Sequence, residues 1–285
     1  MVVSLSGSTG FIGQSLMQKM RELGWTVKAI TRDSFAMPDH EFHEQYIEGA
    51  DIVINLAGAP VSKKWTLEYK QEINDSRVNT TRKISDAIKS GEKKPSVFIS
   101  VSAIGIYDSG HTHTETSMAY ADSFLADVCR RWEHEAMKSE AMTRLIILRL
   151  GVVLGEDGGA LKKMRFPFSI GLGGKLGSGK QAVSFIHISD LVDAIIFIIG
   201  NPSIRGVVNA VSPYPSDNAE LTDKLGKVMD QPAWFTVPPF ALKMIFGEGA
   251  QVLLEGQKVL PEKLLDSGFR FKYPTIQNAL VQIYG

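Results

Sequence analysis

The sequence contains a single cysteine, Cys129, among 285 residues. One cysteine excludes an intramolecular disulfide, and it is typical of proteins that function in a reducing compartment. We interpret Cys129 as a small core residue, because a reactive thiol requires an electropositive and partly exposed setting. The six histidines have no supporting cysteines or acids at metal-ligand spacing, so the sequence predicts no metal site.

The sequence also lacks an excess of charge and a long apolar run. Basic and acidic residues number 31 each, which argues against a nucleic-acid partner held mainly by charge. The longest apolar stretch, residues 191–199, contains Asp193 and is too short to cross a bilayer. No basic segment precedes an apolar one at the start, as a signal peptide would require. We therefore expect a cytoplasmic protein with no nucleic-acid or membrane partner.

A glycine-rich turn near the start of the chain, GSTGFIG, is the most informative feature that is present. An apolar run precedes it, and a helical pattern of apolar residues follows it. Gly7 would permit a tight turn, Gly10 would let the backbone approach phosphates, and Gly13 would let the helix lie close to the strand. The helix N-terminus would offer N–H groups and a partial positive charge. With a second strand at residues 25–30, the pattern predicts a dinucleotide-binding βαβ unit.

The end of that second strand bears on the choice of cofactor. Arg32 there would pair with the 2′-phosphate of NADP, whereas an acid such as Asp33 would accept from the 2′-hydroxyl of NAD. The guanidinium matches phosphate geometrically, so we expect NADP, with NAD as the less favoured alternative. A solvated surface charge is the other interpretation of Arg32.

Several motifs resemble those of one protein family. GSTGFIG is similar to the fingerprint of the extended short-chain dehydrogenases/reductases of the nucleoside-diphosphate-sugar epimerase/dehydratase type. NLAG at residues 55–58 resembles the family's turn beside the adenine and ribose, and GVVLG at residues 151–155 resembles its loop under the nicotinamide. Three C-terminal segments resemble the extension of one uncharacterised epimerase branch, namely GEGA (247–250), LLEGQKVLP (253–261) and GFRF (268–271).

The resemblance implies an α/β fold, a Rossmann-type doubly wound parallel sheet with a smaller C-terminal substrate lobe. We expect residues 1–155 to form the NADP-binding domain, with residues 182–200 returning to it, and residues 156–285 to form mainly the substrate-binding lobe. The chain from Val207 onward is expected to belong to the smaller lobe. Residues 33–50 are too few for a helix, a strand and another helix, so we expect one short helix there and little or no strand.

The resemblance also assigns residues to the cofactor. At Arg77, relatives place a polar residue that faces the cofactor; a surface helix charge is the other interpretation. The expected cofactor-binding residues are Gly7, Thr9, Gly10, Phe11, Ile12, Gly13, Thr31, Arg32, Leu56, Ala57, Gly58, Arg77 and Val152. In relatives, the helix at residues 66–90 and the one that contains Cys129 pair across a homodimer, so the resemblance implies a homodimer.

The family's acid/base device is absent from this sequence. It consists of a tyrosine followed four residues later by a lysine on one helix, so that the ammonium lowers the pKa of the phenol. None of the seven tyrosines has a lysine four residues on, and Leu125 and Cys129 occupy the matching positions. The resemblance leaves Ser102 and Tyr107 as the catalytic candidates, which would orient a reacting oxygen. A turn-forming serine is the other interpretation of Ser102.

Three further segments carry chemistry-bearing residues. Arg149, inside an apolar strand, is interpreted as a paired structural charge. His187 is interpreted as structural, before a helix that Ser189 or Asp190 caps. Residues 155–179 are rich in glycine and lysine, and they predict either a mobile solvated loop or a lid over an anionic substrate.

Two functions remain open from the sequence. The first is an NADP(H)-dependent oxidoreductase or epimerase that acts on a small, anionic or sugar-nucleotide-like substrate without the Tyr/Lys pair. The second is an NADP(H)-responsive regulatory or scaffold protein that keeps the fold and has lost the chemistry. The missing pair favours the second, and the basic glycine-rich segment favours the first.

Overall fold

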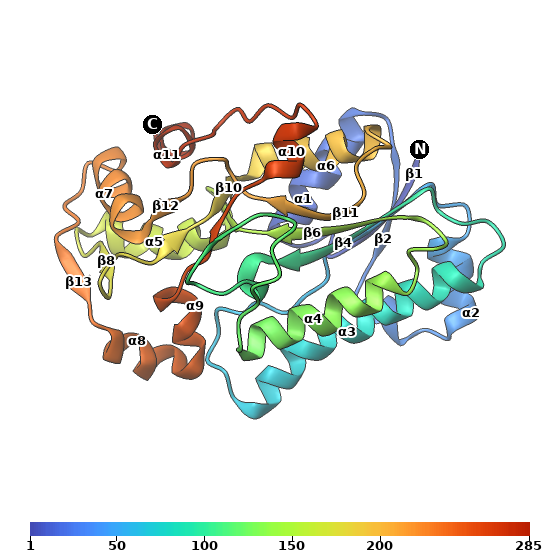
Figure 1. Ribbon diagram of the computed structural model, residues 1–285, viewed down its shortest axis with the longest axis horizontal. Coiled ribbons are helices and arrows are strands. Elements are labelled where there is room, and N and C mark those ends of the chain that lie inside the picture. Colours follow the sequence, from blue (N-terminus) through green and yellow to red (C-terminus); the bar gives the residue numbers. More distant parts are fainter.

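The computed structural model, which describes residues 1–285, has a central sheet of six parallel strands (Figure 1). In spatial order these are β2 (Thr26–Ile30), β1 (Val2–Ser6), β3 (Ile52–Asn55), β4 (Val97–Ala103), β6 (Arg144–Leu150) and β11 (Gly206–Ala210). The central strands are almost wholly apolar because helices cover both faces of the sheet. The predicted α/β class and Rossmann-type arrangement are confirmed.

Two pairs of helices cover the sheet. On one face, α1 (Phe11–Glu22) contacts α6 (Ile188–Gly200), and on the other α3 (Leu67–Ser90) packs along α4 (Phe124–Met137) (Figure 1). Each helix turns a buried apolar stripe towards the strands, as amphipathic helices of a layered fold do. The strands therefore run between two helical layers, with their carboxyl ends pointing to the same edge.

The segment between β2 and β3 is shortened, as predicted. It contains a short 3-10 turn (Asp33–Ala36) and α2 (Asp39–Phe42), which continues as a π-turn to Ile47, and no strand. Phe42 and Ile47 are fully buried against the sheet. These short helical segments thus replace a complete βα unit and still cover the apolar face.

The smaller lobe lies beyond the carboxyl ends of the strands, at the left of Figure 1. Its helices are α5 (Gly159–Ser169), α7 (Asn218–Val228), α8 (Pro239–Phe246), α9 (Gln251–Leu254) and α11 (Ile276–Tyr284). Its strand pairs are β8 (Gly174–Leu176) with β13 (Phe235–Val237), and β9 (Ala182–Val183) with β12 (Ser216–Asp217). The remaining strands are β7 (Val152–Gly155) paired with β10 (Phe185–His187), and β5 (Thr112–His113) paired with β14 (Lys258–Val259). The remaining helical segments are α10 (Glu262–Asp266) and the 3-10 turns Ile104–Ile106 and Gly247–Ala250.

Two sequence-based expectations need correction here. Residues 206–210 form β11, a strand of the main sheet, although the sequence analysis assigned the chain from Val207 onward to the smaller lobe. Much of the glycine-rich segment 155–179 is helix α5 rather than a loop, because Leu161 and Phe168 lie on one helix face and are buried. None of the helices combines the length and apolar character that a bilayer crossing needs.

Helix α6 begins at a buried histidine. His187 is its N-cap, and Nδ1 accepts a hydrogen bond from the Ser189 N–H at 3.1 Å. Ser189 is therefore not the cap, and neither is Asp190, whose carboxylate accepts from the N–H groups of Lys272 and Tyr273. The pKa of His187 is lowered, because the effect of burial outweighs the opposite effects of Gln282 and Asp190. These contacts agree with the structural role predicted for His187.

The His187 cap predicts a pH dependence of stability. The folded state favours the neutral ring of His187. The contribution of this ring to the free energy of unfolding is therefore complete above about pH 6.5, the pKa of an unperturbed histidine, and it is lost as the pH falls below that value. His187→Asn keeps a capping side chain that does not titrate. We expect the stability advantage of the wild type over His187→Asn in urea unfolding to shrink between pH 7.5 and pH 5. An unchanged difference would contradict this assignment.

Candidate functional site

The turn between β1 and α1 holds its glycines against other backbone atoms. Gly7 has φ of +68°, and a Cβ there would lie 2.8 Å from the Leu56 carbonyl oxygen. A Cβ on Gly13 would lie 2.2 Å from the Gly7 carbonyl oxygen, so only glycine lets α1 approach this closely. Gly10 is the N-cap of α1, no side chain caps the helix, and its first turn contains no acid. The N–H groups of that turn are therefore available to an anion, and the turn fits a pyrophosphate.

A buried polar chain fixes the neighbouring loop. Ser6 Oγ accepts from the N–H groups of Leu56 and Ala57, at 3.1 and 3.2 Å, and donates to Asn55 Oδ1 at 2.5 Å. Asn55 Nδ2 donates to Thr81 Oγ1 at 2.7 Å. The sequence analysis missed Ser6 and Thr81; the available signal was a hydroxyl at the end of an otherwise apolar strand. These bonds hold the Leu56 loop against the glycine turn.

The ring of Phe11 lies beneath the turn that joins β7 to α5. A Cβ on Gly158 would lie 2.2 Å from Phe11 Cγ, and one on Gly155 would lie 2.6 Å from Cζ. Val152 begins β7, and its N–H donates to the Ser184 carbonyl oxygen at 2.9 Å. The structure therefore places the start of α1 directly beside the end of β7. Of the other predicted residues in the turn, Thr9 is exposed and Ile12 is half-buried.

Arg77 extends from α3 to the loop that contains Gly58. Its Nη2 donates to the Ala59 carbonyl oxygen at 2.9 Å and its Nη1 to that of Ile73 at 3.1 Å. The guanidinium lies over the Trp132 ring, 5.4 Å from its centroid. A Cβ on Gly58 would lie 3.1 Å from the guanidinium carbon. Arg77 is therefore no ordinary surface charge, because it supports the loop predicted to lie beside the cofactor.

The polar residues at the end of β2 face solvent. Thr31 forms two 3.1 Å hydrogen bonds with Ser34 Oγ, through its N–H and its Oγ1. The Arg32 side chain is 87% exposed, and its Nη2 lies 3.6 Å from Glu72 Oε1. An ion pair this exposed contributes little to stability, so Arg32 can exchange it for a phosphate at small cost.

The C-terminal extension packs on the segment that follows Gly58. Glu248 forms an ion pair with Lys70 of α3, and Gly249 lies against the buried ring of Trp65. A Cβ on Gly249 would lie 3.1 Å from Trp65 Nε1. The last part of the chain therefore braces the loop that leads away from the candidate cofactor residues.

Ser102 and Tyr107 belong to a buried network around an ion pair. Arg149 of β6 contacts Glu133 of α4 twice, through Nε to Oε1 at 2.8 Å and Nη2 to Oε2 at 2.7 Å. Ser102 Oγ donates to Glu133 Oε1 at 2.6 Å, and Arg149 Nη1 donates to the Tyr107 hydroxyl at 2.7 Å. The same Tyr107 hydroxyl donates a hydrogen bond to Asn209 Oδ1 at 3.1 Å. The structural charge predicted at Arg149 is confirmed.

The hydroxyls of both catalytic candidates, Ser102 and Tyr107, are engaged in hydrogen bonds within this network. Ser102 is 2% exposed and Tyr107 is fully buried, and each hydroxyl already has partners within the chain. Burial raises the pKa of Tyr107 and outweighs the lowering effect of Arg149, so the phenol stays protonated at neutral pH. The geometry does not support the expectation that Ser102 and Tyr107 orient a substrate oxygen.

The helix positions of the missing acid/base device are apolar. Leu125 is half-buried against Trp65 and Val128, and the Cys129 thiol lies beside Ser102 and the backbone of Ala103. Burial and the Glu133 carboxylate raise the pKa of Cys129 to about 11. Neither side chain can exchange a proton near neutral pH. No group of three or more His, Cys, Asp or Glu side chains is arranged to hold a metal ion.

The buried pair gives a prediction for stability. Glu133→Gln leaves the Arg149 guanidinium buried without its counterion, which costs about 3–5 kcal/mol of unfolding free energy. Glu135→Gln is the matched control, because Glu135 is also buried but its partners Arg82 and Lys138 reach solvent, with 49% and 38% of their side chains exposed, so the expected loss is about 1 kcal/mol or less. Urea unfolding measures both; equal losses would show that the Glu133 pair is dispensable.

Comparison with known proteins agrees with the fold and the motifs. Residues 3–210 match the model of the NAD dependent epimerase/dehydratase family, and residues 237–283 match the model described as Domain of unknown function (DUF1731). The second match covers the C-terminal extension that the sequence analysis singled out. Both the family and the branch with this extension were therefore predicted correctly.

Relatives cover nearly the whole chain. The chloroplastic SDR39U1 homolog of Arabidopsis thaliana, an epimerase family protein, is 41% identical over 298 residues, which span 98% of this chain and 86% of the relative. Epimerase family protein SH2119 of Staphylococcus haemolyticus is 37% identical over 287 residues, 96% of each chain.

Among solved structures, human epimerase family protein SDR39U1 (isoform 2) with NADPH has a TM-score of 0.92 at 31% identity, and the match covers 100% of this chain and 99% of the human one. The UDP-glucuronic acid 4-epimerase of Bacillus cereus, solved with UDP-glucuronic acid and NAD, has a TM-score of 0.80 at 16% identity and covers 100% and 98%, which shows the fold alone. From the match over residues 3–210 and the relatives of similar length, the chain belongs to the NAD dependent epimerase/dehydratase family.

Proposed function

We propose that the protein binds NADP(H) at the β1–α1 turn and acts as an oxidoreductase or epimerase on a small anionic substrate. The observation that carries the proposal is the turn itself, where Gly7 and Gly13 touch backbone atoms and the first N–H groups of α1 have no side-chain cap. The human relative solved with NADPH supports the choice of cofactor.

Different residues of the site bind different parts of the cofactor. The N–H groups that follow Gly10 bind the pyrophosphate, and Arg32 binds the 2′-phosphate. The Leu56–Gly58 loop would hold the adenosine side of the cofactor, and Val152 would hold the nicotinamide side. Hydride chemistry belongs to the cofactor, and the chain would bind and orient it.

The proton that accompanies hydride transfer needs another source. Leu125 and Cys129 cannot supply it, and Ser102 and Tyr107 are sealed in the Glu133–Arg149 network. The proton therefore comes from water or from the substrate. Basic residues of the α5–β8 region, among them Lys162, Lys163 and Lys175, support an anionic substrate.

The sealed network favours a second candidate function. A protein that binds NADP(H) and reports its redox state to a partner needs no acid/base pair, and it would tolerate Ser102 and Tyr107 as structural residues. Loss of NADPH absorbance on addition of carbonyl compounds or UDP-sugars separates the two candidates, because only the enzyme consumes bound NADPH. A cytoplasmic location stays a prediction, and the Arabidopsis relative is named as chloroplastic.

The role of Arg32 is tested by calorimetric titration with NADPH and NADH. Arg32→Ala removes a charge-assisted contact with the 2′-phosphate, worth about 1.5–3 kcal/mol, so NADPH binding should weaken by about 10- to 100-fold while NADH binding changes little. Arg130→Ala, which removes an exposed arginine of α4, is the control and should change neither affinity.

Two outcomes of this titration contradict the proposal in different ways. If Arg32→Ala weakened NADPH and NADH equally, the assignment of the 2′-phosphate to Arg32 would be wrong. If the wild type bound neither cofactor, the glycine turn would serve the fold alone, and the search for a ligand would move to protein partners.

A further inference from the structure

Arg77 carries an enclosed positive charge that has no carboxylate partner. Its guanidinium lies over the Trp132 ring, and only part of the residue reaches solvent. Burial lowers the pKa of Arg77, and the groups that oppose this effect are the Cys129 thiol and the Tyr69 phenol, not an acid. Both groups stay neutral at pH 7, because the pKa of each is raised above its ordinary value. Proteins pair enclosed charges, so Arg77 lacks the partner that such a charge needs.

Two other arginines show how this chain compensates a charge that is withdrawn from solvent. Arg149 contacts the Glu133 carboxylate through two N–H groups. Arg144 has no carboxylate partner either, but its guanidinium donates to four backbone carbonyl oxygens at and just beyond the C-terminal end of α6, namely those of Ile198, Ile199, Asn201 and Ile204. The negative end of a helix dipole favours a cation at that place. Arg77 donates to only two carbonyl oxygens, and neither lies at the end of a helix, so its charge is the least compensated of the three.

The position of this charge matches the missing half of the family's acid/base device. Cys129 stands where the resemblance places the lysine, and Arg77 is close enough to lower the pKa of the Cys129 thiol against the effect of burial. Arg77 belongs to α3, so the cation approaches this point from a different helix. Leu125 stands in place of the tyrosine, and the charge therefore has no phenol of the device to act on.

The guanidinium also has N–H groups to offer. Of the five N–H donors of an arginine, two are used within the chain at Arg77, and the others have no partner there. A Cβ on Gly58 would lie 3.1 Å from the guanidinium carbon and 3.1 Å from Nη2, so the glycine leaves space on that side. Trp132 is 4% exposed, and its Nε1 donor has no partner in the chain either. The missing partner is therefore an acceptor that carries negative charge.

A single negative charge suits this place better than a double one. No second cation affects the pKa of Arg77, so one carboxylate balances the site, whereas a phosphate group carries a charge of about −1.5 to −2. A carboxylate also matches the planar fork of the guanidinium and can accept two N–H groups at once.

We propose that Arg77 binds a carboxylate of the substrate, and that it supplies in this chain the positive charge that the family's lysine supplies from α4. The inference rests on the proposed function, because it names the chemical class of the substrate that lies beside the cofactor, a small carboxylic acid. Arg77 is a specificity-determining residue in this assignment, and it selects substrates with a negative charge.

Thermal unfolding of the full chain in sodium formate tests the assignment, because formate is the smallest carboxylate and enters any space that a larger one can enter. The chain is first saturated with NADP⁺, and sodium chloride at equal ionic strength is the reference. Formate should raise the Tm of the wild type above its value in chloride, as a ligand that binds only the folded state does. Arg77→Gln removes the charge and keeps an amide donor, and the formate concentration needed for the same rise should increase by about 10- to 100-fold.

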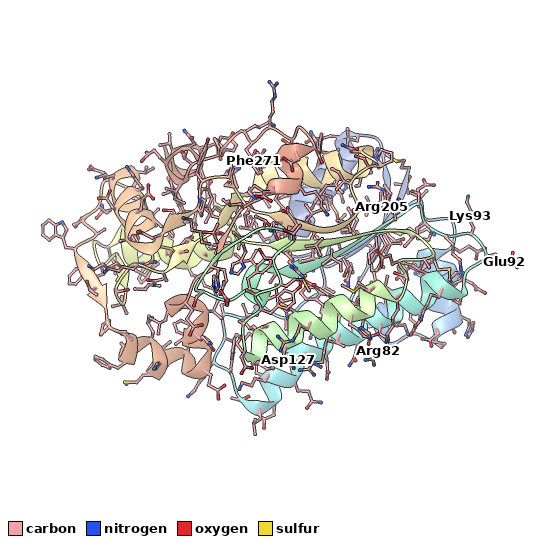
Figure 2. The ribbon with its side chains drawn as sticks, in the orientation of Figure 1. Arg82, Glu92, Lys93, Asp127, Arg205 and Phe271 are labelled. Atoms are coloured by element: carbon pink, nitrogen blue, oxygen red, sulfur yellow. The ribbon has the colours of Figure 1, made fainter.

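Two further variants complete the comparison. Arg205→Gln is the matched control, because Arg205 is an exposed arginine that directly precedes β11, at the edge of the sheet opposite to the carboxyl ends of the strands (Figure 2), and its response to formate should equal that of the wild type. Arg77→Lys keeps the charge and loses the fork, so its response should lie between those of the wild type and Arg77→Gln. If Arg77→Gln does not fold, a wild-type response in Arg77→Lys overturns the two-point contact with a carboxylate.

The outcomes separate this inference from the proposed function. Equal responses of the wild type and Arg77→Gln, or no response in either, overturn the role of Arg77. A response that NADP⁺ abolishes, with NADPH and NADH binding weakened equally in Arg77→Gln, would assign the charge to the cofactor's pyrophosphate and overturn the substrate assignment. If the wild type binds no NADP⁺, the proposed function fails, and the same formate comparison on the cofactor-free chain still decides whether Arg77 binds a carboxylate.

Discussion

The contact between Glu133 and Arg149 determines much of what this protein can do. Two buried charges are stable only if their hydrogen-bonding capacity is met, and this pair meets it by engaging Ser102 and Tyr107. Ser102 and Tyr107, the residues that the resemblance proposes for catalysis, therefore satisfy hydrogen bonds of a buried ion pair. In this chain their hydroxyls stabilise the fold.

The cofactor cradle is separate from that network and depends on backbone geometry. Gly7 and Gly13 allow three backbone segments to meet where any Cβ would collide, and Ser6 with Asn55 ties the third segment in place. In the proposed site, backbone N–H groups hold the anion, which leaves the exposed Arg32 side chain to distinguish NADP from NAD. A dinucleotide site can persist in this arrangement whether or not a catalytic pair accompanies it.

The sequence predicted local features well and long-range partners poorly. The glycine turn, the shortened segment after β2 and the C-terminal extension all depend on contiguous residues, so their patterns were readable. The placement of Ser102 and Tyr107 depends on Glu133, Arg149 and Asn209, which lie 31 to 107 residues away from Ser102 along the chain, and no spacing rule relates them. The His187 cap was missed for a different, local reason, since the serine and aspartate beside it are the commoner caps. The helix in the segment 155–179 was obscured by flanking glycines, although Leu161 and Phe168 already had helical spacing.

The contact of the C-terminal extension with the loop after Gly58 affects the order in which the protein matures. Domains generally fold from the N-terminus as the ribosome releases them, and the first two βα units here contain the glycine turn. The brace from Glu248 and Gly249, however, arrives only when most of the chain has been made, and β11 completes the sheet late as well. A nascent chain therefore presents the glycine turn long before the segment around Trp65 receives its C-terminal contacts. The complete packing around that segment is therefore a property of the finished polypeptide, and it cannot be acquired stepwise during translation.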